Sequence, residues 1–128
     1  MKLLIDTHLL IWVADNAARL PPPARALIAD PENALFFSVA SLWEIATKSG
    51  LNRADFRVNA RLLRRGLIDN GYHELAILGA HVVAIDTLPP IHKDPFDRLL
   101  VAQAIVEDMV LLTNDRVVAQ YHDLVRLA

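Results

Sequence analysis

The sequence predicts an α/β fold, a three-layer α/β/α sandwich in which helices cover both faces of a central, mostly parallel sheet of about five strands. Short apolar runs alternate along the chain with stretches of helical periodicity, which is typical of a parallel sheet with crossover helices. The runs are continuously apolar, as expected for strands that are buried on both faces. With 128 residues and 54% apolar content, the chain predicts a single domain, residues 1–128.

Five short apolar runs are the expected strands, at residues 3–5, 35–37, 75–77, 109–112 and 124–125. Helical patterns follow at residues 9–13, at 24–29 after a proline break, at 42–46 with Gly50 as the stop, and at 62–68 with an end near Asn70-Gly71. Residues 99–106 form the most apolar pattern and predict a central helix. Paired prolines predict an irregular loop at residues 87–93.

Composition excludes several classes of function. The chain has no cysteine, so a disulfide framework, a thiol nucleophile and a thiolate metal site are excluded. Its net charge of −2 disfavours indiscriminate binding to nucleic acid, although a local basic patch can still bind it. No apolar stretch approaches the roughly 20 residues of a membrane span, and no signal peptide is evident, so we expect a cytoplasmic protein.

Four acids, Asp6, Glu44, Asp97 and Asp115, each stand at or just beyond a point where an apolar run ends and a helix begins. The carboxyl ends of parallel strands meet at one edge of a sheet, where open α/β folds bind ligands. Carboxylates gathered there repel one another unless some stay protonated or a cation joins them. Mg²⁺, or Mn²⁺, prefers such oxygen ligands, so the pattern favours a metal site.

Helix capping is the competing interpretation, because acids are favoured at helix starts. Asp6 suits a cap, residues 41–44 match a capping box, Asp94 precedes a proline at a first helical position, and Asn114-Asp115 suits a turn. Other residues are available as caps, which makes the four acids partly surplus to capping: Thr7, Ser38 or Ser41, Asp94 and Asn114. Glu44 belongs inside its helix if Ser38 is the cap.

Several segments together resemble PIN-domain ribonucleases, and in particular the VapC toxins of bacterial toxin–antitoxin pairs. They are Leu4-Ile5-Asp6-Thr7, Ser41-Leu42-Trp43-Glu44-Ile45-Ala46, His92-Lys93-Asp94-Pro95-Phe96-Asp97-Arg98-Leu99-Leu100 with Ala102-Gln103-Ala104, and Leu112-Thr113-Asn114-Asp115. The resemblance spans essentially the whole chain in the family's order, and its specific part is the Asp-Pro-Phe-Asp-Arg stretch.

The resemblance implies a Mg²⁺-dependent endoribonuclease that acts as a toxin, pairs with a small VapB-like antitoxin protein and forms a homodimer. Asp6 and Asp97 match the family's principal metal-binding acids, Glu44 its glutamate and Asp115 its fourth acid. Asp94 is either a further ligand or a cap that aims its helix. Thr7 and Thr113 place hydroxyls near the site or bond to backbone. One metal ion and two remain open alternatives.

A metal that activates water needs no ribose 2′-hydroxyl, so this chemistry does not exclude DNA, and the preference for RNA comes from the resemblance alone. Basic residues near the acids are candidates for phosphate contact or for structural salt bridges: Lys48, Lys93, Arg98 and Arg116. A second basic group is a phosphate-binding face, a solvated helix face or an antitoxin contact: Arg53, Arg57, Arg61, Arg64 and Arg65, with Asp55 as the one acid among them.

The histidines and tryptophans are interpreted as residues without a catalytic role. The five histidines lack metal-ligand spacing and are interpreted as surface or loop residues: His8, His73, His81, His92 and His122. Trp12 and Trp43 are expected to pack in the core, with base stacking as the alternative.

Three other functions fit the pattern less well. A phosphoacceptor receiver domain needs an acid pair at the first strand, where only Asp6 stands, and an aspartyl phosphatase needs an acid where His8 stands. A PIN-like domain that only binds its partner stays open as an alternative.

Overall fold

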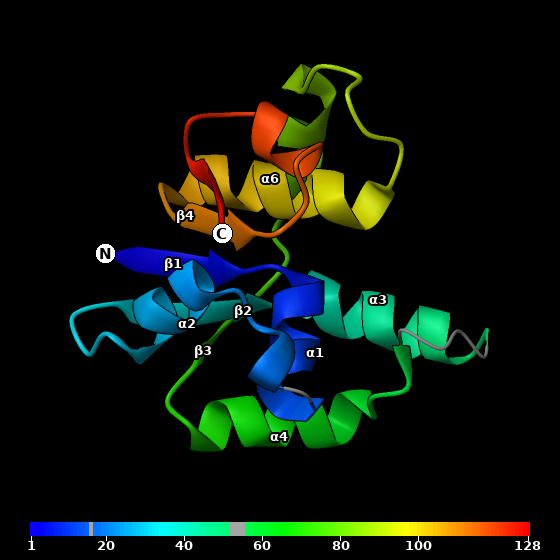
Figure 1. Ribbon diagram of the computed structural model, residues 1–128. Helices are drawn as coiled ribbons and strands as arrows, with labels where there is room; N and C mark the ends of the chain where they lie inside the picture. The colour runs from blue at the N-terminus through cyan, green and yellow to red at the C-terminus, as the bar shows by residue number, and fades with distance from the viewer. Residues whose placement is uncertain (16, 52–55) are drawn as a thin grey trace.

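The protein, seen here as a computed structural model whose described residues are 1–15, 17–51 and 56–128, is built on a five-stranded sheet (Figure 1). All strand pairs are parallel and the order is β3-β2-β1-β4-β5. The strands are β1 (Lys2–Ile5), β2 (Ala34–Ser38), β3 (His73–Leu75), β4 (Val110–Thr113) and β5 (Val125–Leu127). The predicted five-stranded parallel sheet is confirmed.

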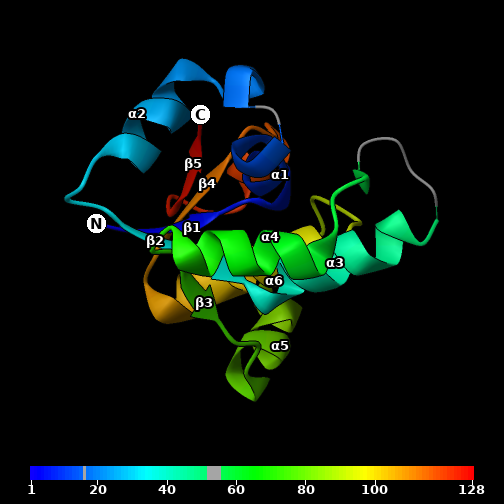
Figure 2. The ribbon, with the colours of Figure 1, turned by 90° about the horizontal axis from the view of Figure 1, so that it is seen from below.

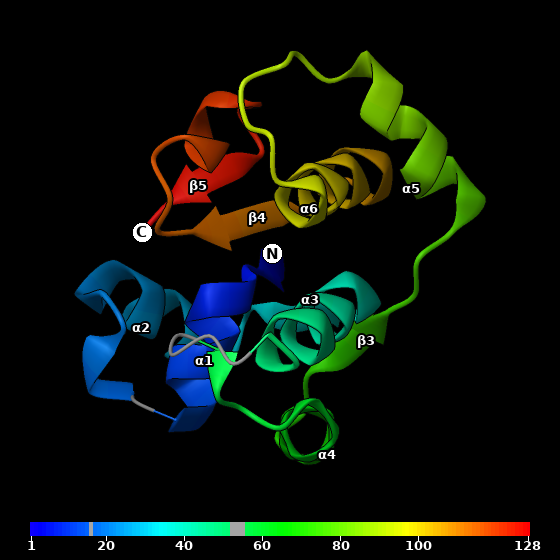
Figure 3. The same cartoon turned by 90° about the vertical axis from the view of Figure 1, so that its right-hand side faces the viewer.

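Helices connect successive strands and cover the sheet. The α-helices are α1 (Thr7–Asp15), α2 (Pro22–Ala29), α3 (Val39–Ser49), α4 (Ala60–Asp69), α5 (Gly79–Ala84) and α6 (Pro95–Glu107). Short 3₁₀ turns add η1 (Ala17–Arg19), η3 (Ile85–Thr87) and η4 (Val118–Gln120). Figures 1 and 2 show α4 on the outside of the α1 layer, and Figure 3 shows α5 and α6 on the other side of the molecule.

Two hydrophobic cores lie on opposite faces of the sheet. Leu3 and Ile5 of β1 pack into one core with residues of α1 and α4, whereas Leu4 packs into the other with residues of α6. All three side chains are fully buried. Successive side chains of a strand point to opposite faces, so a strand covered on both sides must be apolar at every position. This explains the continuous apolar runs of the sequence.

Two elements differ from the prediction. Strand β3 occupies His73–Leu75, two residues before the predicted run at 75–77, because its pairing with β2 sets Ser38 opposite Leu75. Helix α5 was not predicted. It has only six residues, and the side chain of its N-cap residue, Leu78, makes no hydrogen bond to the amides of the first turn. Its position depends on contacts with α6, described below.

Helix ends agree with the sequence signals. Ser38 caps α3 by accepting a hydrogen bond from the amide of Ala40 at 2.9 Å. Helix α4 ends before Gly71, whose φ of 85° is readily adopted only by glycine. Within the described ranges, no helix has both the length and the apolar character that crossing a membrane requires.

Candidate metal centre

Five carboxylates line one pocket of about 410 Å³ at the carboxyl edge of the sheet: Asp6, Glu44, Asp94, Asp97 and Asp115. Asp6 directly follows β1, and Asp115 lies two residues beyond β4. Strands β1 and β4 are parallel neighbours although they are far apart in sequence. The strand order reverses between them, since β2 and β3 lie on the far side of β1 and β5 lies on the far side of β4. Open α/β sheets bind ligands at this kind of switch point. The predicted convergence of the four acids is therefore seen in the structure.

Asp6 is a buried acid with two supports. Its side chain, in a residue only 4% exposed, accepts the amide of His8 at 2.9 Å and the hydroxyl of Thr113 at 2.9 Å. Burial raises the pKa of Asp6, although these hydrogen bonds act in the opposite direction. Asp6 itself caps α1, so the prediction that Thr7 was the available cap is wrong. The Thr7 hydroxyl instead donates to Ser41 at 2.9 Å.

Glu44 lies inside α3 rather than at its start. Because the cap is Ser38, the interpretation of residues 41–44 as a capping box is wrong. The Glu44 residue is 2% exposed, and its Oε2 lies 2.5 Å from Nζ of Lys48. Its Oε1 is buried and has no hydrogen-bond partner among the described residues. An unpaired buried carboxylate oxygen is costly, so this atom is suited to a ligand that brings positive charge.

Asp94 and Asp97 divide two roles at the start of α6. Asp94 is the predicted N-cap before a proline, and its Oδ1 accepts the amides of Phe96 at 2.8 Å and Asp97 at 3.4 Å. Burial, followed by the charges of Asp6, Asp94, Glu44 and Asp115, raises the pKa of Asp97 to about 8. Four acids therefore act electrostatically on one carboxyl group, which is the self-repulsion that the sequence predicts.

Thr113 joins two of the acids. Its hydroxyl donates to Asp6 and accepts the amide of Asp115 at 3.1 Å. The side chain of Asp115 accepts the amides of Val117 at 2.8 Å and Val118 at 3.4 Å. Asp115 thus stabilises the turn in which it lies. The expectation that Asn114 would cap this turn in place of Asp115 is wrong. Capping accounts for Asp6, Asp94 and Asp115 in part, but for neither Glu44 nor Asp97.

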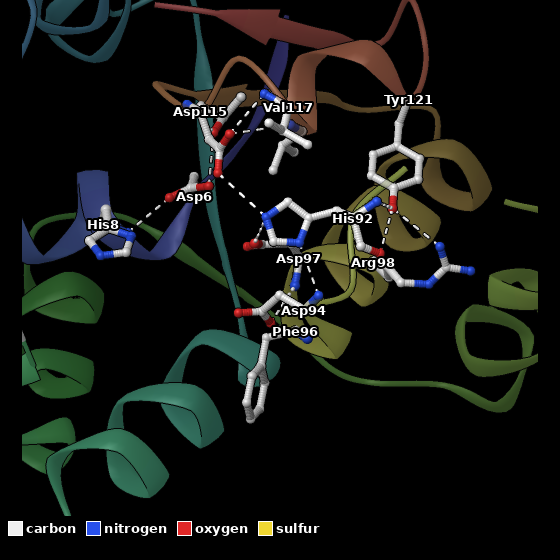
Figure 4. Close-up of polar contacts among 12 residues, drawn as sticks. Asp6, His8, His92, Asp94, Phe96, Asp97, Arg98, Asp115, Val117 and Tyr121 are labelled. Atoms are coloured by element: carbon white, nitrogen blue, oxygen red, sulfur yellow. Dashed lines mark hydrogen bonds and ion pairs between the residues drawn. The ribbon is translucent and has the colours of Figure 1, made fainter. Parts of the chain in front are cut away.

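His92 enters the acidic cluster, which sequence spacing did not indicate. Its Nε2 lies 3.5 Å from Asp97 and 3.8 Å from Asp115, and one ligand atom from each of the three residues falls within 4.8 Å of the others (Figure 4). The amide of Asp94 donates to Nδ1 of His92 at 2.9 Å. A neutral ring that accepts at Nδ1 carries its hydrogen on Nε2. His92 therefore presents an N–H group to the acids and not a lone pair for a metal.

The basic candidates separate into distinct positions. Lys48 and Arg116 line the pocket, whereas Lys93 is exposed outside its lining. The Arg98 guanidinium donates to the carbonyl oxygens of Pro89 and Ile85 and to the hydroxyl of Tyr121. Figure 4 shows these groups on the side of the His92 segment away from Asp6. The geometry thus gives Arg98 the task of fixing the loop before α6, in place of the predicted phosphate contact.

Two other expectations, those for His81 and Trp43, are corrected. His81 is fully buried in α5, where Nε2 lies 2.7 Å from Glu107, so it is no surface residue. His8 lies on α1 and lines the pocket. Trp43 is 53% exposed, with its ring 4.6 Å from that of Phe96, so it does not pack in the core.

The described arginines of the second basic group lie on α4 or just before it. Arg64 forms an ion pair with Glu74 at 2.6 Å, and Arg57 lines a larger groove of about 860 Å³ beside α4. Arg61 and Arg65 are exposed on α4. The two remaining members of the predicted group, Arg53 and Asp55, lie outside the described residues.

The donor set fits a hard divalent cation. Carboxylate oxygens from Asp6, Glu44, Asp97 and Asp115 face one pocket, and oxygen is the ligand that Mg²⁺ and Mn²⁺ prefer. The unpartnered Oε1 of Glu44 supplies a free ligand atom within it.

Comparisons with known proteins identify a family and related folds. The model of the PIN domain matches residues 3–124. Three solved structures share the fold. VapBC2 from Rickettsia felis bound to a DNA fragment from its promoter matches with a TM-score of 0.71 and 12% identity, over 100% of this chain and 98% of that one. VapBC-1 from nontypeable Haemophilus influenzae matches with a TM-score of 0.60 and 17% identity, over 94% of this chain and 91% of that one, and a toxin–antitoxin complex from Klebsiella pneumoniae with a TM-score of 0.55 and 20% identity, over 88% of this chain and 86% of that one. Among curated proteins, none matches this chain in sequence.

Proposed function

The chain belongs to the PIN domain family, and on this premise we propose that it is a Mg²⁺- or Mn²⁺-dependent endoribonuclease. One observation carries the proposal: among the described residues, the buried Oε1 of Glu44 has no hydrogen-bond partner, and it lies in a pocket with four further carboxylates, where burial and the neighbouring charges raise the pKa of Asp97. A pocket built only to cap helices has no need of Glu44 or Asp97. A divalent cation would give the buried oxygen of Glu44 a partner and would neutralise the carboxylate of Asp97.

The residues have separate tasks in this proposal. Asp6, Glu44, Asp97 and Asp115 hold the ion, which polarises the phosphate and activates water when bound. Thr113 fixes the side chain of Asp6 and the backbone of Asp115. Asp94 orients α6 and so aims Asp97 into the pocket. Thr7 supports the site only indirectly, through its bond between α1 and α3.

One exposed group in the pocket lining, and two next to lining residues in sequence, suit contact with a nucleic acid. Arg116 is exposed and lines the pocket, Lys93 is exposed beside Asp94, and Trp43 offers an exposed ring for base stacking. RNA is the proposed substrate because of the family resemblance. The hydrolytic chemistry itself extends to DNA.

An antitoxin is the proposed partner, since the structural neighbours were crystallised as toxin–antitoxin complexes. The groove beside α4 suits a mainly apolar segment with an acidic residue. It is lined by Leu62, which is 67% exposed, by Arg57 and by Tyr72, whose buried hydroxyl has no partner in the described part of the chain. A second copy of the chain is proposed to pack on the exposed apolar residues of α5, Val82 and Val83.

The activity is tested with purified protein and a mixed-sequence RNA. Cleavage is expected with Mg²⁺ or Mn²⁺ and is expected to stop in excess EDTA, and sequencing of the RNA ends gives the cleavage site. Cleavage that persists without metal contradicts the mechanism. If Asp6→Asn arrests growth as well as the unmodified chain does, toxicity does not come from this site, and a role in binding alone replaces the enzyme.

The partner is tested by capture with Asp6→Asn as bait. The captured protein is expected to restore growth when it is coexpressed with the active chain, and to lose binding to the groove variant Leu62→Asp. Restored growth with undiminished binding to Leu62→Asp contradicts the assignment of the groove. Sedimentation of the free chain against Val83→Glu tests the dimer.

A further inference from the structure

Lys48 is a positive charge held inside the acidic pocket. Its Nζ lies 2.5 Å from Oε2 of Glu44 and 3.2 Å from Oδ2 of Asp94, and its side chain is only 14% exposed. The ammonium also lies over the rings of Phe56, at 4.8 Å from the centroid, and Phe96, at 5.6 Å. Two carboxylates and two aromatic faces therefore fix this cation in one position.

We propose that Lys48 is the permanent second cation of the centre, and that the pocket consequently holds one divalent ion and not two. The proposal rests on the metal site of the proposed function and assigns its stoichiometry. The ion is held by Asp6, Asp97, Asp115 and the free Oε1 of Glu44. Lys48 takes the place that a second metal has in two-metal nucleases.

The oxygens on the Lys48 side are already engaged. Asp94 uses Oδ1 for the amides of Phe96 and Asp97, and its Oδ2 faces the ammonium of Lys48, which is already a cation. Glu44 uses Oε2 for Lys48 and keeps only Oε1. A second ion would have to displace an ammonium group from two carboxylates. Because Lys48 already neutralises Asp94 and Asp94 caps α6, its role in this proposal is a supporting one.

An ordinary helix ion pair explains these contacts less well. Glu44 and Lys48 are four residues apart, as in many solvated pairs on helix surfaces, but such pairs are exposed and contribute little. Here both side chains are largely buried, and Lys48 also contacts the cap of another helix, α6. The lysine is thus part of the pocket and does not belong to a solvent-exposed ion pair on α3.

The test is the number of tightly bound Mn²⁺ ions per chain, counted from the free Mn²⁺ signal in electron paramagnetic resonance. The unmodified chain is expected to bind one. Lys48→Met keeps the apolar stem but removes the charge, and is expected to bind two, because Oε2 of Glu44 and Oδ2 of Asp94 become free. Lys48→Arg keeps a cation and is expected to bind one. Lys2→Met, at the opposite edge of the sheet, is the control and is also expected to bind one.

Two ions in the unmodified chain overturn the proposal, and this result does not depend on how any variant folds. One ion in a folded Lys48→Met overturns it as well, because the lysine then excludes no metal. Both results leave the proposed nuclease intact. No bound ion in the unmodified chain overturns the metal site itself, and with it the proposed function.

Discussion

The two sides of the acidic pocket hold their negative charge by different means. Beside β1 and β4, Asp6 accepts hydrogen bonds from the hydroxyl of Thr113 and the amide of His8, and Asp115 accepts the amide of Val117; none of these donors carries a full charge. Beside α3, Glu44 and Asp94 share the ammonium of Lys48. Uncompensated charge therefore gathers on the β1–β4 side and on Asp97, and a divalent ion is needed there. The comparison teaches that a carboxylate's neighbours, and not its presence alone, decide whether it binds metal.

Replacing Asp97 by Asn is expected to have the largest effect, because Asp97 faces the ion from the uncompensated side. RNA cleavage and Mn²⁺ binding are expected to fall by more than the roughly 10–100-fold typical of losing an outer-shell partner. The fold is expected to persist, since repulsion among the acids decreases. Cleavage assays and Mn²⁺ titration measure both effects, with the exposed Asp69→Asn on α4 as control. Unchanged Mn²⁺ affinity would remove Asp97 from the ligand set.

Replacing Thr113 by Val tests the hydrogen-bonded side. The change keeps the shape but removes the hydroxyl that supports Asp6 and Asp115, so Mn²⁺ affinity is expected to fall by about 10–100-fold. The matched control is Thr7→Val, which removes a buried hydroxyl bond to Ser41 outside the pocket lining. This control is expected to lower thermal stability with little effect on Mn²⁺ affinity. Equal losses of affinity in both variants would mean that buried hydroxyls act only through stability.

The pH dependence of stability isolates Asp97. Its pKa in the folded chain is raised to about 8 from the ordinary value of 3.8, so the folded state binds this proton more tightly than the unfolded state does. The resulting stabilisation is complete below the unfolded pKa and is lost as pH rises toward the folded one. Without metal, the unmodified chain is therefore expected to lose thermal stability relative to Asp97→Asn as pH rises, so the margin by which the melting temperature of Asp97→Asn exceeds that of the unmodified chain is expected to grow from about pH 5 to about pH 8. A difference that is constant with pH contradicts this assignment.

Replacing His92 by Asn is expected to have the smallest effect on metal binding. The Asn Oδ1 can accept the amide of Asp94 as Nδ1 does, while the N–H group that faces the acids is lost. Because that group is a donor and not a ligand, Mn²⁺ affinity is expected to change little. Nitrogen NMR of the unmodified chain is expected to find the hydrogen of the neutral ring on Nε2. A large loss of affinity would instead identify His92 as a ligand.

Strands and long helices were readable from the sequence because burial on both faces leaves a local signal. Runs of apolar residues gave β1, β2 and β4 nearly to their ends, and the glycine at position 71 marked the end of α4. Helix α5 gave no such signal. It is held by His81, whose Nδ1 accepts the amide of Leu78 at 3.0 Å and whose Nε2 contacts Glu107 of α6. Partners so distant in sequence leave no local periodicity.

The candidate acids were also readable, since Asp6 and Asp115 follow strands, Asp97 stands in the first turn of a helix and Glu44 lies on the helix after β2, but their roles were not. That Asp6 caps its own helix and that Asp94 has both oxygens engaged depends on distances between elements. His92 joined the cluster through tertiary contacts alone. Lys48 was a candidate from the sequence, four residues after Glu44, but its contact with Asp94 depends on how α3 and α6 pack.

By itself, the sequence determined that this is a parallel α/β domain with acids at the ends of its strands, because apolar periodicity and helix signals are local properties. Only the tertiary structure decided which charge each carboxylate faces. Electrostatic energy depends on the distance between groups and on their burial, and both are set by how helices from different parts of the chain pack around the sheet edge.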